Sequence, residues 1–341
     1  MGKKWIAIIL LLLVSSGAAC SGETVDALTY AVFPYVPDVE HYQELVESRW
    51  AEIEPDIKLV RAEWNCYHDG APEGIDVVMY DAIKRDALIE AGWIQPIEPD
   101  AVQNAGDIFP FALEGFTVDG RLYGIPAFLC GNYLIYDRDC GALAGVEHIT
   151  DLAGESGVLV INSEDRTNRQ QYACEALADA LGEANPPMDS GAEEALALID
   201  RLAVDAHRGD DDDQVALAYD SGIGWGYIGF SESMRFLDRR MSRTGIKAIS
   251  FSDKENLPRV YADAAAVTGG AEGLRYEKSV ELMNVMAEAD ILAALTVQDG
   301  VPRYLMLARR SPYAALAGQF PIYGQMEALA SNAENHVILG P

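Results

Sequence analysis

Basic residues are scarce in this chain. It contains 25 Lys and Arg residues against 54 Asp and Glu residues, which gives a formal net charge of −29 at pH 7. A surface of this charge repels phosphate backbones and anionic lipid head groups, so nucleic acid is excluded as an expected partner. A cationic ligand would be attracted, although solubility or adaptation to salt accounts for the same composition.

Long hydrophobic runs are also scarce. The run from Trp5 to Val14 follows Lys3 and Lys4 and precedes small residues up to Cys20, which is typical of an export signal over residues 1–20. Gly17-Ala18-Ala19-Cys20 resembles the lipobox of bacterial lipoproteins, with Gly where that family usually has Leu. We therefore expect an exported protein. It is either a periplasmic or cell-surface lipoprotein anchored through Cys20, or a secreted protein cleaved without lipidation.

Only four cysteines follow Cys20. An exported chain often pairs its cysteines, so two disulfides are the ordinary expectation. If Cys130 is a free thiol, three of these four cysteines remain, and an odd number cannot all pair. In that case Cys140 and Cys174 form the plausible bridge, and Cys66 is expected to be buried and inert.

The remaining chain of about 320 residues exceeds what one hydrophobic core usually supports, so two lobes are expected. Hydrophobic alternation predicts strands, helical spacing predicts helices, and the two types follow one another as in a parallel α/β sheet. The predicted strands are 27–35, 57–64, 74–80, 157–162, 246–251 and 264–267, and the predicted helices are 42–53, 81–91, 168–181, 192–204, 278–289 and 291–294, before a Pro-containing tail. Such sheets bind ligands at the carboxyl ends of their strands, where Tyr35, Tyr67 and Asp81 lie.

Several segments resemble type II periplasmic binding proteins. They are Asp76-Val77-Val78-Met79, Ala91-Gly92-Trp93-Ile94-Gln95-Pro96-Ile97, Gly120-Arg121-Leu122-Tyr123-Gly124-Ile125-Pro126 and Leu134-Ile135-Tyr136-Asp137-Arg138-Asp139. This resemblance implies a two-lobed α/β fold of the type II periplasmic-binding-protein kind, with a ligand cleft between the lobes. We expect residues 24–137 with about 255–300 in the first lobe, and residues 138–254 with about 301–341 in the second.

Three further segments resemble thiaminase I, the thiamine pyridinylases. They are Gly124-Ile125-Pro126-Ala127-Phe128-Leu129-Cys130, the stretch from Tyr219 to Gly229-Phe230-Ser231-Glu232, and Tyr261-Ala262-Asp263. The resemblance implies that Cys130 is the nucleophile and Glu232 its base. It also implies that Asp81 and Asp263 bind a pyrimidine, with Tyr35, Tyr67, Tyr219 and Tyr261 as further substrate contacts.

The chain departs from the family pattern at three points. Phe230 stands where the family has Tyr in its Gly-Tyr-Ser-Glu motif, and Phe33 stands at a second position where a pocket tyrosine is expected. Either change removes a hydrogen bond to substrate and shifts preference toward a relative of thiamine. A further pocket aspartate is expected before Cys130, for which Asp107 and Glu114 are candidates.

The chemistry also follows from the residue types. A thiol of pKa about 8.5 is only a few per cent thiolate at neutral pH, so Cys130 needs a base, and no His falls in the motifs around Cys130 or Glu232. A desolvated carboxylate among other acids has a raised pKa, which suits Glu232. The thiazolium of thiamine departs neutral without protonation, so we expect no metal and no organic cofactor.

Two classes of function are compatible with these residues. The first is a transferase, expected to be a monomer, that replaces the thiazole of thiamine by a nucleophilic co-substrate such as a pyridine, an aniline or a thiol. The second is a thiamine or pyrimidine receptor of a transporter, in which Cys130 only packs. A sugar or peptide receptor is a third and weaker alternative.

Overall fold

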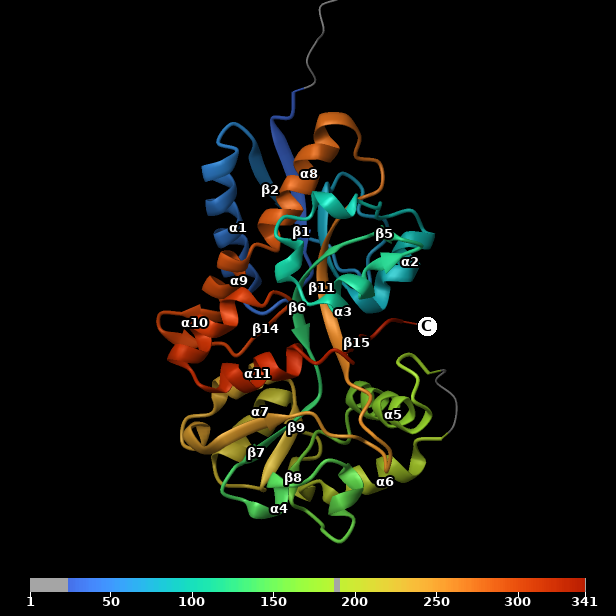
Figure 1. Ribbon diagram of the computed structural model, residues 1–341, viewed down its shortest axis with the longest axis vertical. Coiled ribbons are helices and arrows are strands. Elements are labelled where there is room, and N and C mark those ends of the chain that lie inside the picture. Colours follow the sequence, from blue (N-terminus) through green and yellow to red (C-terminus); the bar gives the residue numbers. More distant parts are fainter. Residues whose placement is uncertain (1–23, 187–190, 341) are drawn as a thin grey trace, which may run out of the picture.

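The computed structural model describes residues 24–186 and 191–340, so the expected signal segment and Cys20 lie outside the described residues. The described chain forms two lobes, each built around one main sheet, stacked along the long axis of the molecule (Figure 1). The chain passes between the two sheets in both directions, through residues 131–132 and through residues 248–258.

The sheet of the first lobe has the strand order β14-β6-β11-β3-β1-β2, and β15 pairs with β11. Its strands are β1 (Ala27–Val32), β2 (Lys58–Ala62), β3 (Val77–Asp81), β6 (Ile125–Cys130), β11 (Arg259–Val267), β14 (Met306–Leu307) and β15 (His336–Val337). β1 runs parallel to β2 and β3, whereas β11 runs antiparallel to β3 and β6. The expectation of a parallel sheet is therefore correct for β1, β2 and β3 and for the pairing of β15 with β11. It is wrong for β11 beside β3 and β6, because β11 enters this lobe at the end where β6 leaves it.

Helices pack against this sheet and against the junction of the lobes (Figure 1). Those of the first lobe are α1 (Val39–Ile53), α2 (Arg85–Glu90), α3 (Pro110–Gly115), α8 (Gly273–Met286) and α9 (Ala289–Thr296). The segment expected to be a Pro-containing tail instead forms α10 (Ser311–Gln319) and α11 (Ile322–Ala330). α11 contacts both β14 of the first sheet and β10 of the second, so it joins the two lobes.

The sheet of the second lobe has the order β10-β7-β9-β8. Its strands are β7 (Tyr133–Asp137), β8 (Leu159–Val160), β9 (Gly226–Gly229) and β10 (Thr244–Lys247). The helices of this lobe are α4 (Gly141–Ala144), α5 (Arg166–Leu181), α6 (Glu193–Leu202) and α7 (Asp212–Asp220). Two small hairpins, β4 (Thr117–Val118) with β5 (Arg121–Leu122) and β12 (Val297–Gln298) with β13 (Val301–Pro302), complete the fold.

Several observed boundaries differ from those expected. β1 ends at Val32 rather than at residue 35, just before Phe33 and Pro34. β11 begins at Arg259 rather than at residue 264. Sheet membership also differs from the expected lobe ranges, because β7 lies in the second sheet while β14 and β15 lie in the first.

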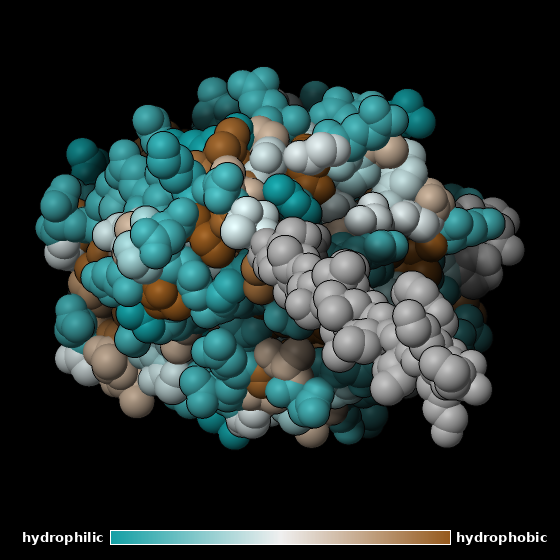
Figure 2. All heavy atoms as spheres, turned by 90° about the horizontal axis from the view of Figure 1, so that it is seen from above, coloured by the Kyte–Doolittle hydropathy of each residue, from teal (hydrophilic) through white to brown (hydrophobic). Residues whose placement is uncertain are grey.

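Buried hydrophobic side chains form two clusters. The larger one fills the first lobe and continues through the junction to Tyr219 on α7 and Tyr227 on β9. The smaller one lies within the second lobe, around Leu134, Tyr172 and Phe251. The outer surface of the first lobe, seen from above, is mostly hydrophilic with scattered hydrophobic residues (Figure 2). Within residues 24–186 and 191–340, no helix has both the length and the apolar character needed to cross a bilayer.

Candidate active site

Four of the expected site residues share one face of the first sheet. Cys130 is the last residue of β6 and lies directly opposite Tyr261 on β11. Asp263, two residues further along β11, lies directly opposite Asp81, the last residue of β3. Side chains of directly opposed residues lie on the same face, and residues two apart along a strand do as well. The register therefore brings Cys130, Tyr261, Asp263 and Asp81 together.

A β-bulge adjoins this group. Asp263 pairs with Phe128 while the next residue, Ala264, pairs with Pro126, so Ala127 is the extra residue on β6. A bulge bends its strand and increases the local twist, and bulges occur often beside active sites because they change the direction of nearby side chains. Here the bulge lies between the buried part of the sheet and the end that carries Cys130.

The second lobe contributes Glu232 to the same place. β9 ends at Gly229, and the chain then forms a short 3-10 helix, Ser231–Phe236, that begins next to Glu232. The ring of Phe230 packs edge-on against the ring of Tyr261, with centroids 6.0 Å apart. This contact across the two lobes holds the start of the 3-10 helix beside the sheet face that carries Cys130.

The charges at the site act strongly on the Cys130 thiol. Burial raises its pKa well above the ordinary value, and the negative charges of Glu232, Asp263 and Asp81 raise it further. Burial also raises the pKa of Glu232 to about 7, against the opposing effect of Arg235. A protonated thiol therefore lies within electrostatic reach of a carboxyl group that is half ionised near neutral pH, which is the pairing that general base catalysis requires.

The two aspartates form a coupled pair. Burial and the neighbouring Asp81 raise the pKa of Asp263 well above its ordinary value. Burial also raises the pKa of Asp81, although hydrogen bonds from the Tyr67 hydroxyl and the Ile83 backbone N–H lower it in part. Neighbouring buried carboxyl groups titrate as a unit and favour a ligand that brings hydrogen-bond donors or positive charge. An aminopyrimidine supplies both.

Aromatic rings border the aspartate pair. The rings of Tyr35 and Tyr67 pack edge-on with centroids 5.9 Å apart, and Phe33 packs against both at 6.1 and 6.5 Å. The Lys84 ammonium lies 4.9 Å from the centroid of the Tyr67 ring. Tyr35 is 64 % exposed, so its ring is accessible to a ligand. Flat aromatic faces beside carboxylates fit a flat heterocycle that carries positive charge.

Comparisons with known proteins identify the family of this chain. No family model matches the chain. A curated thiaminase-1 of Paenibacillus thiaminolyticus is 31 % identical over 99 % of this chain and 91 % of that protein. This chain belongs to the thiaminase I family. Among solved structures, thiaminase I of Clostridium botulinum in complex with thiamin matches with a TM-score of 0.84 and 27 % identity, over 92 % of this chain and 94 % of that one.

The same comparisons confirm the fold class. The maltose-bound MalE3 of T. maritima matches with a TM-score of 0.68 and 12 % identity, over 92 % of this chain and 89 % of that one, which shows a shared fold alone. The chain is thus a thiaminase I-like transferase on the fold of type II periplasmic binding proteins.

Tyr219 does not join the site. Its side chain is fully buried on α7, where its ring packs at 5.3 Å from the ring of Tyr227. Its hydroxyl lies 3.4 Å from the Thr244 hydroxyl, and the Arg240 guanidinium covers its other side. Tyr219 therefore belongs to the buried cluster at the junction of the lobes, and in this structure it lies on no surface that a ligand could reach, unlike the expected substrate contact.

Neither candidate for a further pocket aspartate joins the site. Asp107 accepts hydrogen bonds from the backbone N–H and the hydroxyl of Ser311, both at 2.8 Å, and so fixes the start of α10. Glu114 is exposed on α3. Both residues belong to the first lobe, where Asp107 stabilises the start of α10 and Glu114 is exposed to solvent.

Cys66, Cys130 and Cys140 form no disulfide in this structure. The expected bridge between Cys140 and Cys174 is therefore not formed, and the ordinary expectation of two disulfides is wrong. Cys66 is buried as expected, and burial raises its pKa to about 12. Cys130 keeps part of its surface accessible.

A second group of polar residues lies behind Cys130 and was not anticipated from the sequence. Arg259 is two residues before Tyr261 on β11, and its guanidinium lies 3.5 Å from the carboxylate of Glu175 on α5. Both side chains are nearly excluded from solvent, and burial raises the pKa of Glu175 to about 7. The pair joins the two lobes next to Tyr261. One sequence signal could have indicated that Arg259 lies on a strand. It is the alternation of polar side chains at Arg259, Tyr261 and Asp263.

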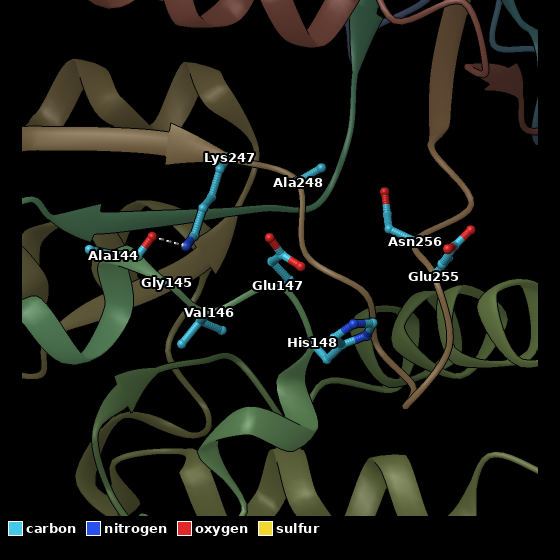
Figure 3. A pocket seen from close by; sticks show the side chains of 9 residues that line it. All are labelled: Ala144, Gly145, Val146, Glu147, His148, Lys247, Ala248, Glu255 and Asn256. Carbon is cyan, nitrogen blue, oxygen red and sulfur yellow. Dashed lines mark hydrogen bonds between the residues drawn. The ribbon is translucent and has the colours of Figure 1, made fainter.

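A pocket of about 380 Å³ in the second lobe is separate from this site (Figure 3). Lys247 borders it, but its ammonium donates to the carbonyls of Leu143 at 2.6 Å and Ala144 at 3.2 Å, so it caps the end of α4. None of the expected site residues lines this pocket. In the part of the chain that the structure describes, no cluster of three His, Cys, Asp or Glu side chains could hold a metal ion.

Proposed function

We propose that this transferase replaces the thiazole of thiamine by another base or thiol, through a covalent bond between Cys130 and the pyrimidine. The observation that carries the proposal is the position of the Cys130 thiol, opposite Tyr261 and within electrostatic reach of Glu232. The match to thiaminase I of Clostridium botulinum, solved in complex with thiamin, supports the choice of substrate.

The first half of the reaction forms the intermediate. Glu232 takes the proton of the Cys130 thiol, and the sulfur electron pair forms a bond to a carbon of the aminopyrimidine ring. Electrons then move through the ring and form a double bond to the methylene carbon. The bond from that carbon to the thiazolium nitrogen breaks, and its electron pair stays on the nitrogen, so thiazole leaves neutral.

The second half regenerates the thiol. A pyridine, aniline or thiol acceptor donates its electron pair to the methylene carbon, the ring electrons return, and the carbon–sulfur bond breaks with its pair on sulfur. Glu232 returns the proton to Cys130, and an amine or thiol acceptor loses its own proton to solvent. No external oxidant or reductant takes part.

The remaining groups would bind and orient the pyrimidine. Asp81 and Asp263 accept hydrogen bonds from the exocyclic amine and polarise the ring while it gains electrons. Tyr35, Tyr67 and Tyr261 contact the ring faces, and a favourable contact with a cation contributes about 0.5 to 2 kcal/mol. Because Phe230 stands in place of the family's tyrosine, the hydroxyl at this position is missing. This shifts preference toward a substrate that needs no hydrogen bond there.

We also propose that the mature chain acts outside the cytoplasm as a monomer, after removal of residues 1–20, either anchored through a lipid on Cys20 or secreted. The signal-like sequence supports the export and the anchor. Mass spectrometry of the mature protein, purified from the organism that makes it, would detect the lipid on Cys20. An unmodified and soluble mature chain would contradict the anchor.

The decisive assay is exchange. Incubation of the mature chain with thiamine and aniline is expected to give a pyrimidine–aniline adduct and free thiazole, both separable by chromatography. Cys130→Ser is expected to abolish exchange and to keep thiamine binding, measured by tryptophan fluorescence. Binding without any exchange by the wild-type chain would make it a receptor, and undiminished exchange by the variant would exclude Cys130 as nucleophile.

A further inference from the structure

A pocket of about 460 Å³ opens between the two lobes and is lined in part by Arg235, three residues after Glu232. The first lobe contributes Asp38, Leu295, Arg303 and Leu305, and the second contributes Arg235 and Phe236. We call it the arginine pocket. Its lining combines side chains of both lobes, and nothing in the proposed reaction so far uses it.

Leu305 and Arg235 relate this pocket to the reacting groups. Met306 on β14 pairs with Leu129 and Leu307 pairs with Phe128, so Leu305 lies just before β14, at the end of the sheet where β6 reaches Cys130. Arg235 follows Glu232 on the same 3-10 helix and acts on its charge.

The lining combines positive charge with apolar surface. The Arg303 guanidinium lies 3.1 Å from Asp38, and that of Arg235 lies 3.4 Å from Asp213 and 4.7 Å from the centroid of the Phe236 ring. Both arginine side chains remain 31 % exposed. One guanidinium group over an aromatic ring, a second guanidinium group and two leucines line this pocket, in a chain of net charge −29. Guanidinium groups bind carboxylate and phosphate oxygens in a bidentate manner.

The proposed reaction needs space for the group that is exchanged, and this step rests on the proposed function. The pyrimidine stays bound at Asp81 and Asp263, while the group on its methylene carbon is exchanged. Thiazole leaves and the acceptor enters at the same carbon, so both occupy the space beyond Cys130 in turn. We propose that the arginine pocket binds an anionic group on this exchanged partner, either the carboxylate of an aromatic acceptor or a phosphate on the thiazole side chain.

Matched acceptors test the pocket. Aniline and 3-aminobenzoate carry amines of similar basicity, and only the second carries a carboxylate. Arg303→Gln is expected to lower the ratio of kcat/KM for 3-aminobenzoate to that for aniline by roughly tenfold, as expected for one partly screened charged hydrogen bond. Arg121→Gln, which removes an exposed arginine of the first lobe, is the control and should leave the ratio unchanged.

A second arm separates the two sources of the anion. With aniline as acceptor, Arg303→Gln is expected to reduce kcat/KM for thiamine monophosphate relative to thiamine if the thiazole phosphate is the anion. A selective loss in either arm supports the pocket and identifies its ligand. Equal ratios for the wild type and Arg303→Gln in both arms would overturn it.

Failure of the proposed function gives a different result. Thiamine with aniline contains no anion, so an inactive wild-type chain in that reaction contradicts the exchange itself. Calorimetric titration of the wild-type chain and Arg303→Gln with 3-aminobenzoate then tests the pocket independently. Binding weakened about tenfold by the variant supports it, and equal binding overturns it.

Discussion

Replacing Glu232 by Gln removes the proposed base and leaves its shape almost unchanged. The Cys130 thiol has a pKa above its ordinary value, so without a base its thiolate fraction at pH 7 falls below the few per cent of a free thiol. A positioned general base contributes roughly 10²- to 10⁴-fold. We therefore expect Glu232→Gln to lower kcat for thiamine and aniline by about 10³-fold.

The pH dependence gives a sharper test than the rate alone. Because the base must be ionised, kcat/KM of the wild type is expected to rise with pH and to level off above an apparent pKa of about 7. This rise should be absent in Glu232→Gln. Glu175→Gln is the matched control, since burial raises the pKa of Glu175 to about 7 as well. That variant should keep the rise, measured at a temperature where it is folded.

Stability should change in the opposite direction from activity. The pKa of Glu232 is raised in the folded chain, so its protonation stabilises the fold at low pH, and this contribution is lost as pH rises through about 7. A rise from 4.5 to about 7 corresponds to about 3 kcal/mol. Calorimetry at pH 8 should therefore find Glu232→Gln more stable than the wild type, with little difference at pH 4. A variant that keeps both the rate and its pH dependence would refute the assignment.

Three further variants test the surroundings of the reacting groups. Tyr67→Phe removes the hydroxyl that donates to Asp81, and kcat/KM for thiamine should fall about tenfold, chiefly through KM; an unchanged KM would contradict this. Asp263→Asn should lower kcat/KM by roughly 10²-fold, because a charged contact to the ring is lost, and a loss below threefold would place the amine elsewhere. Tyr219→Phe should leave steady-state kinetics within about twofold and cost roughly 1 kcal/mol in unfolding free energy, whereas a large rise in KM would return Tyr219 to the binding site.

The strands of the first lobe could be predicted because their patterns are simple. β1 and β3 are almost wholly buried, and a short apolar run bounded by turn residues indicates such a strand. The first half of β11 was missed for the opposite reason. Arg259, Tyr261 and Asp263 carry polar groups at every second position there, and these interrupt the apolar run that identified the other strands, although most of this strand is buried.

The two C-terminal helices were missed because of their prolines. Pro312 and Pro321 read as residues that end regular structure, yet each lies at the start of a helix, α10 or α11. Proline is favourable there, since the first turn needs no backbone N–H donor and the fixed φ suits a helix. A proline therefore marks the boundary of a helix, but it does not indicate whether the helix precedes or follows it.

The site residues differ in how well the sequence located them. The strand-end pattern located Tyr35, Tyr67 and Asp81. Resemblance located Cys130, Tyr261 and Asp263, because no strand was predicted over these residues. The Tyr219 placement also depended on resemblance alone, and the structure buries that side chain fully. The contact between Glu175 and Arg259 joins residues far apart in the chain, so no local pattern could have revealed it.

The most direct measurement is mass spectrometry of the chain quenched in acid during turnover of thiamine. We expect the peptide that contains Cys130 to gain the mass of the pyrimidinylmethyl group. The amount of this adduct should increase when the acceptor is omitted, and the adduct should be absent in Cys130→Ser. Exchange that proceeds with no adduct on Cys130, or with the adduct on another residue, would contradict it.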